Sequence, residues 1–411
     1  MDLGVTTLEA VLGVACGEEL TSPWESAWLL RQREWSFAPT VYSAWEQAGR
    51  SLSPAIRYDL ELQRGRIAWY RELSEKLLVA VPGVIGVKGL EVADRYPPGL
   101  LRYMNDLDFW VPDEADIWRA TAALVGWGWE VWQATFGRDG DRLRVLVSLR
   151  HPHHEDPYAQ PYGVELSNYL SLGDLGGVAP LLDLPARWRR PELKNLIMLL
   201  LERFEQPYRA RDLVDAVLLL DGLERPDRRT LWAAVDRYRL WPEYAELAAR
   251  VADTPLPPVP RPRWLPAAAA LARVRRGAAV AGTFRQPVDG GLRHLQRRLL
   301  YGDQRRPERW AWSIVQGRLS APRALRAGMS LFGLPVDGAP VGTDRAVLGR
   351  HGRTVWADTP AGRFLLAPGD VLTEDLLDDL PADPQPCTVD GSTVDGPEPG
   401  LDGPAVDGGP R

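Results

Sequence analysis

Cysteine is scarce in this sequence, and its scarcity excludes two kinds of stabilised fold. The two cysteines, Cys16 and Cys387, lie far apart, which suits neither a disulfide framework nor a structural zinc site, so a reducing compartment is expected. The N-terminus carries acidic residues and no basic stretch, unlike a secretory signal peptide. The longest aliphatic run, residues 196–201, is too short to span a bilayer. We therefore expect a soluble cytoplasmic protein without a membrane partner.

Lysine is also rare. Of the 49 basic residues, only Lys76, Lys88 and Lys194 are lysine, and the rest are arginine. A skew of this kind usually reflects a GC-rich genome, but it makes each lysine worth inspecting. The net charge of −6 is too mild to identify a partner, whereas the hydrophobic content of 45% is enough to bury a sizeable core.

The 411 residues are enough for two or three domains. Apolar spacing and changes in composition divide the chain into segments. The last of these is rich in Pro, Gly, Asp and Ser and has too little apolar surface to offset the entropy of ordering. In order, we expect an N-terminal helical segment (1–80), a mixed α/β core (81–172), a helical domain (173–255), an arginine-rich helical region (256–331), a small β-containing region (332–381) and a disordered tail (382–411).

Two groups of side chains invite an interpretation as ligand-binding surfaces. Fifteen arginines against three acidic residues lie in residues 261–326, with Trp310 and Trp312 among them. Such a stretch can bind nucleic acid, but we favour an arginine-biased helical domain that pairs with the acidic remainder. We likewise favour packing roles over a ligand platform for the tryptophans of the first segment, which are Trp24, Trp28, Trp35 and Trp45.

The start of the core has the pattern of a strand, a tight turn and a short helix. Residues 84–87 are apolar and lie between Pro82–Gly83 and Lys88–Gly89, which predicts a strand that enters a turn. A helix is expected from Leu90 to about Tyr96, where two prolines follow. Glycine lets a phosphate approach the backbone, and a helix N-terminus offers free N–H groups to an anion. Lys88 and Gly89, with Arg95 and Arg102 beyond them, are therefore candidate phosphate-binding residues.

Residues 106–111, Asp-Leu-Asp-Phe-Trp-Val, alternate with a period of two. The pattern predicts a strand with its apolar residues on one face and with Asp106 and Asp108 on the other. Two unit charges about 4 Å apart repel by about 4 kcal/mol at an effective dielectric near 20. A divalent ion that prefers oxygen, Mg²⁺ or Mn²⁺, is the natural neutraliser. A third carboxylate from a neighbouring strand would complete a two-metal site, and Glu165 lies in a later strand candidate, residues 163–169.

The segment Gly86-Val-Lys-Gly-Leu, followed by Tyr96, Arg102 and Asn105-Asp-Leu-Asp-Phe-Trp-Val, resembles the signature of the uncharacterised nucleotidyltransferase family within the DNA polymerase β-like superfamily. Val164-Glu165-Leu166 is similar to the family's later acidic strand, although Ser167 stands where histidine often follows. Residues 208–215 are similar to its helical segment, and the resemblance covers roughly residues 65–250.

The resemblance implies an α+β (mixed α/β) fold. A small nucleotidyltransferase-type sheet with flanking helices would be followed by a mainly helical region and the disordered tail, and residues 81–172 would be the nucleotidyltransferase core. Asp106, Asp108 and Glu165 would be the catalytic residues and would hold Mg²⁺ or Mn²⁺. Lys88 and Gly89, with Arg95 and Arg102, would bind the nucleotide. The expected reaction transfers a nucleoside monophosphate from an NTP, with ATP favoured, to a hydroxyl of a small molecule or peptide and releases pyrophosphate.

Two other functions stay open beside this one. The same core acting on nucleic-acid ends would use residues 261–326, and a non-catalytic binder of a nucleotide or partner could share the scaffold. The histidine cluster at residues 151–154 fits zinc poorly because proline interrupts it. We interpret it as a polar loop beside the active site that leads into Glu165.

Overall fold

The computed structural model describes residues 3–20, 22–152, 160–171, 181–204, 206–283, 291–292, 295–296, 319–336, 342–351 and 354–369. The predicted tail, 382–411, and residues 284–290, 293–294 and 297–318 of the arginine-rich stretch lie outside these residues. Within the described part of the chain, no helix is both long and apolar enough to cross a membrane.

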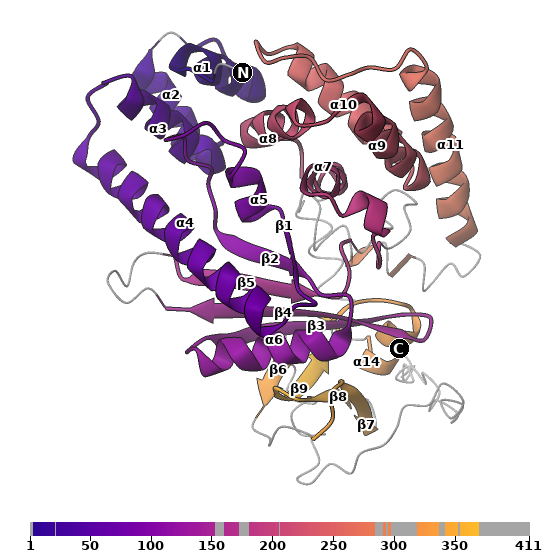
Figure 1. Cartoon of the computed structure of the whole chain (residues 1–411). Coiled ribbons are helices and arrows are strands. Elements are labelled where there is room, and N and C mark those ends of the chain that lie inside the picture. Colours follow the sequence, from indigo (N-terminus) through magenta and orange to yellow (C-terminus); the bar gives the residue numbers. More distant parts are fainter. Residues whose placement is uncertain are drawn as a thin grey trace, which may run out of the picture.

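The fold is mixed α+β and is organised around a mixed sheet in the order β1-β2-β5-β4-β3-β6-β9-β8-β7 (Figure 1). The pair β2 and β5 is parallel, and the other neighbours in this sheet are antiparallel. Its strands are β1 (Ile85–Val87), β2 (Asp106–Trp110), β3 (Glu130–Asp139), β4 (Arg142–His151), β5 (Tyr162–Ser167), β6 (Leu331–Val336), β7 (Val347–His351), β8 (Thr354–Thr359) and β9 (Gly362–Ala367).

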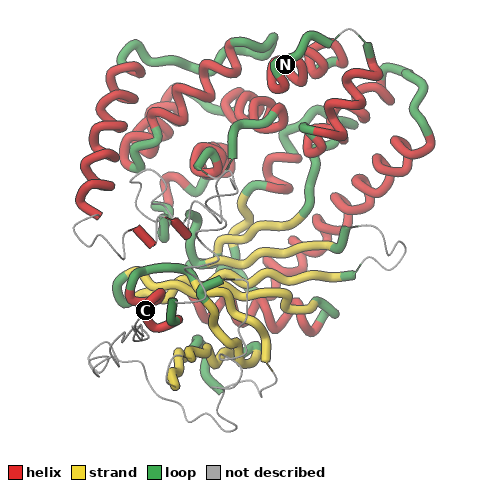
Figure 2. Tube along the Cα trace, turned by 180° about the vertical axis from the view of Figure 1, so that it is seen from behind, coloured by secondary structure: helices red, strands yellow, loops and turns green. Residues whose placement is uncertain are grey.

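The strands of the predicted β-containing region (332–381) extend the sheet that carries the aspartates. β6 pairs with β3 through Thr135 and Phe332, and β9, β8 and β7 follow it. Seen from behind, the sheet twists strongly along this direction (Figure 2). The carboxylate-bearing strand β2 therefore lies near one end of the sheet, next to the edge strand β1.

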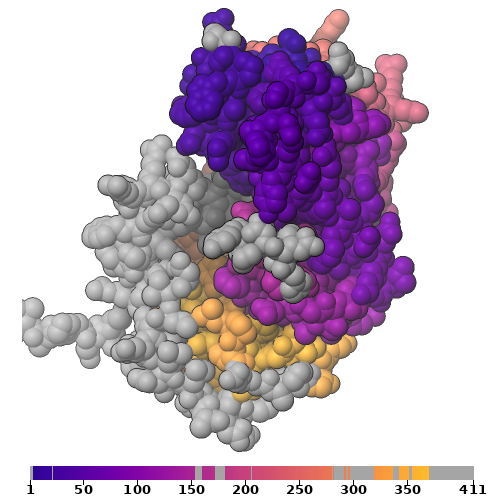
Figure 3. Space-filling model, turned by 90° about the vertical axis from the view of Figure 1, so that its left-hand side faces the viewer, coloured from indigo at the N-terminus to yellow at the C-terminus, as the bar shows by residue number. Residues whose placement is uncertain are grey.

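The N-terminal helices belong to the indigo and purple part of the chain, whose first segments lie at the top of the space-filling view (Figure 3). They are α1 (Val5–Cys16), α2 (Pro23–Gln32), the 3-10 turn η1 (Trp35–Phe37), α3 (Ala38–Gln47) and α4 (Pro54–Ala80). Serine caps begin two of them: Ser22 and Glu25 form a capping box on α2, and the Ser53 hydroxyl accepts from the backbone of α4. Of the four tryptophans expected to anchor packing, only Trp45 is buried. Trp24, Trp28 and Trp35 are 76%, 47% and 46% exposed, so that prediction was wrong for them.

A second set of helices lies beside the β1 edge of the sheet (Figure 1). It comprises the turn η2 (Ala186–Trp188), α7 (Pro191–Glu202), α8 (Ala210–Asp221), α9 (Arg225–Arg237), α10 (Trp241–Ala252) and α11 (Leu265–Thr283). One apolar core joins these helices to α1, α2 and α3. Nearly every residue of α7 and α8 is buried, as expected for helices that pack on several sides.

A second apolar core lies on the sheet. It includes the inward residues of β2 to β5, the C-terminal half of α4, helix α6 (Glu114–Gly126) and the short helix α14 (Ala321–Arg326). Helices α4 and α6 cover one face of the sheet (Figure 1). Because α4 contributes Leu60 to the first core and Tyr70 to the second, it joins the helical layer to the sheet. The short helix α5 (Gly89–Ala93) follows β1 between the two layers.

Candidate functional site

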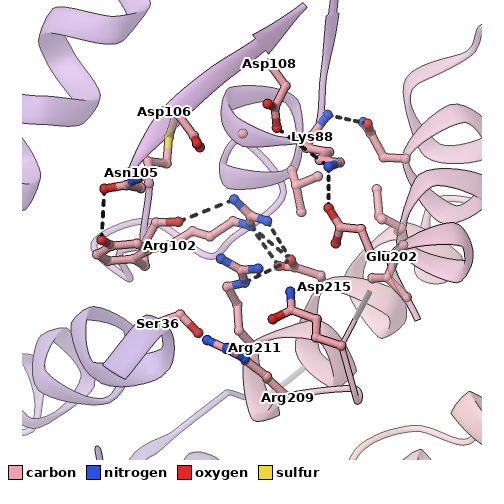
Figure 4. A pocket seen from close by; sticks show the side chains of 18 of the residues that line it. Ser36, Lys88, Arg102, Asn105, Asp106, Asp108, Glu202, Arg209, Arg211 and Asp215 are labelled. Carbon is pink, nitrogen blue, oxygen red and sulfur yellow. Dashed lines mark hydrogen bonds and ion pairs between the residues drawn. The ribbon is translucent and has the colours of Figure 1, made fainter. Parts of the chain in front are cut away.

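A cavity of about 310 Å³ lies where β2 and β5 meet the helices α7 and α8 (Figure 4). Asp106 and Asp108 lie on one side of this cavity, and Arg209 and Arg211 lie on the opposite side. We call it the carboxylate cavity. Its lining also includes Trp35, Ser36, Lys88, Gly89, Val92, Arg102, Tyr103, Met104, Asn105, Glu165, Asn195, Leu199, Glu202, Gln206, Asp215 and Leu219.

The three predicted carboxylates line this cavity together. Leu107 and Phe109 are buried in the sheet core, so the alternate residues Asp106 and Asp108 face away from that core. In the parallel pair of β2 and β5, Asp108 lies opposite Glu165. Asp106 lies opposite Gly163, where a Cβ atom would come within 3.2 Å of the Asp106 Cβ. Glycine at that position therefore leaves room for the Asp106 side chain.

The carboxylates carry more negative charge than their surroundings balance. Burial, and then the neighbouring Asp108 carboxylate, raises the pKa of Asp106 to about 7. Burial, with repulsion from Asp108 and Asp106, raises the pKa of Glu165 to about 8. The Ser148 hydroxyl donates to Glu165 over 3.4 Å, which is a weak contact. The protein alone thus leaves this cluster short of positive charge.

The Lys88–Gly89 turn has the unusual backbone that its sequence suggests. Lys88 has a φ of +56° and Gly89 a φ of +40°; the first is an uncommon conformation for a residue with a side chain. At Gly89, a Cβ would come within 3.3 Å of the Met104 Cε. Helix α5 begins at Gly89 and ends at Ala93, three residues earlier than predicted.

Two side chains of helix α7 hold this turn in place. The Asn195 Oδ1 accepts the backbone N–H of Lys88 over 2.6 Å, and the Asn195 amide donates to Glu91 over 2.8 Å. Lys194 is buried, and its ammonium donates to the Gly86 carbonyl and to Glu91, the latter over 2.9 Å. Lys194 thus holds the turn in place through these contacts, and it is not among the residues that line the cavity.

The Lys88 ammonium lies between two carboxylates. It pairs with Glu202 and lies 3.7 Å from Asp108 (Figure 4). Burial alone would raise the pKa of Glu202, but the Lys88 charge and hydrogen bond lower it below its usual value. Glu202 was missed by the sequence argument because it ends a helix more than a hundred residues after Lys88, where no local pattern marks it.

Of the two arginines predicted to bind the nucleotide, only Arg102 lines the carboxylate cavity. Arg102 lines the cavity, but its guanidinium is buried and binds both oxygens of Asp215, with Nη2 at 2.8 Å and Nε at 3.0 Å. The Tyr96 hydroxyl donates to the same Asp215 over 2.8 Å. Arg95 is not among the lining residues and instead pairs with Glu192. The charge of Arg102 is thus already paired with Asp215, and Arg95 lies apart from the carboxylate cavity.

Other arginines face the carboxylates in their place. Arg209 precedes α8, and its guanidinium lies 5.4 Å from the centre of the Trp35 ring. Arg211 is 3.4 Å from Asp212, and its buried Nε, 3.9 Å from Asp215, has no hydrogen-bond partner within the described residues. Both belong to the segment 208–215 that carries the family resemblance, so that likeness was the signal available for them.

The predicted histidine loop lies only partly within the described residues. His151 ends β4 and contacts an aromatic cluster, with its ring 5.5 Å from those of Trp69 and Trp129. His153 and His154 lie outside the described residues. Among the residues described, no three His, Cys, Asp or Glu side chains are already grouped closely enough to hold a metal ion, and this includes Asp106, Asp108 and Glu165.

Comparisons with known proteins give no relative for this chain: no family model, no curated protein and no solved structure matches it.

Proposed function

We propose that this protein is a metal-dependent nucleotidyltransferase. It would transfer a nucleoside monophosphate from an NTP, with ATP as the favoured donor, to a hydroxyl of a small molecule or peptide, and release pyrophosphate. The observation that carries this proposal is the lining of the carboxylate cavity. Three carboxylates from adjacent strands share one wall, and Lys88, Arg209 and Arg211 supply positive charge around the same space.

The donor set suits Mg²⁺ or Mn²⁺. Asp106, Asp108 and Glu165 offer only oxygen atoms, which these hard cations prefer. Burial, and then repulsion between the carboxylates, raises the pKa of Asp106 and of Glu165, and a bound cation would favour their ionised forms. Lys88 already shares its charge with Glu202. When bound, the metal would supply charge neutralisation and activation of an attacking hydroxyl.

The other residues of the cavity have binding roles in this proposal. A triphosphate carries several negative charges, and Arg209 and Arg211 offer guanidinium groups opposite the carboxylates. The Lys88 ammonium lies 3.7 Å from Asp108 and lines the same cavity, where it can contact the phosphates. Because Asn195 and Lys194 fix the turn, the position of Lys88 is set before a nucleotide arrives.

Action on nucleic-acid ends has less support from the described residues. In the described start of the arginine-rich stretch, Arg276 is buried against Glu243, which follows the pattern of an arginine-biased helix paired with acidic partners. Trp310 and Trp312 lie outside the described residues. A small acceptor therefore remains the favoured substrate class.

Analysis of reaction products tests the proposed chemistry. The protein would be incubated with each of the four NTPs and Mn²⁺ or Mg²⁺, and the nucleotides would be separated by ion-exchange chromatography. We expect cleavage between the α- and β-phosphates, giving pyrophosphate and a nucleoside monophosphate that is either free or attached to an acceptor. Asp108→Asn should abolish this cleavage. Release of inorganic phosphate and a nucleoside diphosphate by the wild type, lost in the variant, would refute nucleotidyl transfer.

A further inference from the structure

A second cavity of about 370 Å³ adjoins the carboxylate cavity. The two share Trp35 and Tyr103, whose rings meet edge to face with centroids 5.0 Å apart. We call it the N-terminal cavity because helices α2, α3 and α4 form most of its wall. Its lining is Leu30, Arg31, Trp35, Ala38, Pro39, Tyr42, Asp59, Leu60, Leu62, Gln63, Arg66, Tyr103 and Gln160.

The chain segment that leads into β2, beside both cavities, is firmly held. The Leu101 carbonyl accepts from the Thr40 hydroxyl over 2.8 Å, and the Leu101 N–H donates to Ser43 over 3.0 Å. Further along the same segment, the Asn105 carbonyl accepts from the Tyr70 hydroxyl over 2.6 Å and from Arg66 over 3.2 Å. Helices α3 and α4 thus fix the chain that leads directly into the catalytic strand β2.

Tyr103 connects this segment to both spaces. Its hydroxyl lies 3.1 Å from the Gln160 side chain, at the N-terminal cavity, and 3.3 Å from that of Asn105, at the carboxylate cavity. Tyr103 precedes Asp106 by three residues. The two cavities therefore adjoin at Trp35 and Tyr103, which line both of them.

The lining favours an uncharged ligand with an apolar body. Leu30, Ala38, Tyr42, Leu60 and Leu62 supply apolar surface. Arg66 is committed to backbone carbonyls of Asn105, Pro161 and Gln160. The remaining charges are one of each sign, Arg31 and Asp59, so the cavity does not suit a polyanion. Its volume falls within the range of roughly 300–1,000 Å³ that is typical of small-molecule sites.

We propose that the N-terminal cavity is the acceptor site and that it takes a small hydroxyl-bearing molecule with an aromatic or aliphatic body. This inference rests on the proposed function. The hydroxyl oxygen of the acceptor forms a bond to the α-phosphorus, the bond from that phosphorus to the pyrophosphate oxygen breaks, and the hydroxyl proton is released to water. Trp35 and Tyr103 are positioning residues that aim the hydroxyl at the nucleotide.

Saturation-transfer NMR with 2-phenylethanol as the probe tests this assignment, with the polyol mannitol as a polar comparison. Two substitutions fill the cavity from different helices, Ala38→Phe on α3 and Leu62→Phe on α4. Ala122→Phe is the matched control because Ala122 is exposed on α6, away from both cavities. Thermal unfolding of each variant shows whether it is folded. Because the two substitutions lie on different helices, the test still stands if one of the two variants does not fold.

We expect the wild type and Ala122→Phe to bind 2-phenylethanol and not mannitol, and both cavity-filling variants to lose the probe. Asp106→Asn/Asp108→Asn should keep the probe and lose Mg²⁺-dependent ATP binding. Ala38→Phe should lose the probe and keep Mg²⁺-dependent ATP binding. Failure of the wild type to bind the probe, or unchanged binding in both filled variants, would overturn the acceptor site alone. Probe binding by a wild type that binds no nucleotide would overturn the proposed function, and the acceptor role with it.

Discussion

The backbone N–H of Lys88 donates a 2.6 Å hydrogen bond to the Oδ1 of Asn195, which lies 107 residues further along the chain. Lys88 has a φ of +56°, a conformation that costs about 1–3 kcal/mol and persists only where its surroundings enforce it. The side chain of Asn195 is part of that enforcement, and Lys194 beside it binds the carbonyl of Gly86. Helix α7 therefore shapes the turn that presents Lys88 to the carboxylate cavity.

Asn195→Ala should weaken nucleotide binding more than its effect on stability explains. The loss of a buried hydrogen-bond partner costs about 1–3 kcal/mol, and the turn is then free to relax. Asn168→Ala is a matched control, because Asn168 is equally buried and its side chain also makes two hydrogen bonds, to the backbone of Val145 and of Leu143. Denaturant unfolding and nucleotide titration of both variants give the comparison. Equal loss of affinity in the two would show that the Asn195 contact has no special role.

Arg102 and Arg95 should differ sharply in their effects on stability. The Arg102–Asp215 pair is buried. Arg102→Met leaves the Asp215 carboxylate with only the Tyr96 hydroxyl and the more distant Arg211, and should cost about 3 kcal/mol. Arg95 is partly exposed, and its partner Glu192 keeps a 2.9 Å contact with Arg190. Arg95→Met should therefore cost only about 0–1 kcal/mol. Urea unfolding measures both, and similar losses would contradict the scaffold role of Arg102.

The stability of the metal-free protein should fall as the pH rises from about 5 to 8. In the unfolded chain both carboxyls titrate near pH 4, whereas in the folded protein the pKa of Asp106 is about 7 and that of Glu165 about 8. Between these limits the folded state binds more protons than the unfolded state, so the free energy of unfolding decreases with pH. The contribution is fully present below about pH 4 and is lost above about pH 8.

Metal should reverse this trend, because metal binding requires deprotonated carboxylates. Thermal unfolding at pH 5.5 and pH 8.0, with and without Mg²⁺, should show the larger Mg²⁺ stabilisation at pH 8.0. Without metal, Glu165→Gln should raise the stability at pH 8.0 and change it little at pH 5.5. A Mg²⁺ effect that is the same at both pH values would argue against the carboxylates as its site.

Arg209→Met should weaken nucleotide binding by about tenfold, which corresponds to 1.4 kcal/mol and to the loss of one charge-assisted contact. Arg187→Met is the control: its guanidinium lies 4.8 Å from the centre of the Trp188 ring, as that of Arg209 lies over Trp35, but it does not line the carboxylate cavity. Titration of each variant with the preferred nucleotide and Mg²⁺ gives the affinities. If both variants bind as the wild type does, Arg209 does not contact the phosphates.

Local pattern was sufficient to predict the elements that carry the carboxylates. The alternation through Asp106 and Asp108 predicted β2, and the apolar run before Lys88 predicted β1 and the turn. The strand with Glu165 was also found in place. These three predictions succeed because a period of two and a glycine turn are properties of a few adjacent residues.

Contacts between distant segments were beyond the reach of the sequence. Glu202, Asn195 and Asp215 reach the cavity through packing of α7 and α8 against β1 and α5, and no local spacing encodes such packing. The exposed Trp35 was misjudged because hydrophobicity alone does not tell a core tryptophan from one that lines a cavity. The pairing of β6 with β3 joins residues nearly two hundred positions apart. The spacing of apolar residues within one segment cannot predict a pairing over that distance.

The most direct test of the account is metal-dependent nucleotide binding by the wild type and by Asp106→Asn/Asp108→Asn. Thermal unfolding of both would be followed with ATP, GTP, CTP and UTP, with and without Mg²⁺ or Mn²⁺. A nucleotide at about a hundred times its dissociation constant adds about 2.7 kcal/mol, a shift of a few degrees. The account predicts such a shift for the wild type with at least one nucleotide, only when metal is present, and its loss in the variant. No shift with any nucleotide, or an equal shift in the variant, would contradict it.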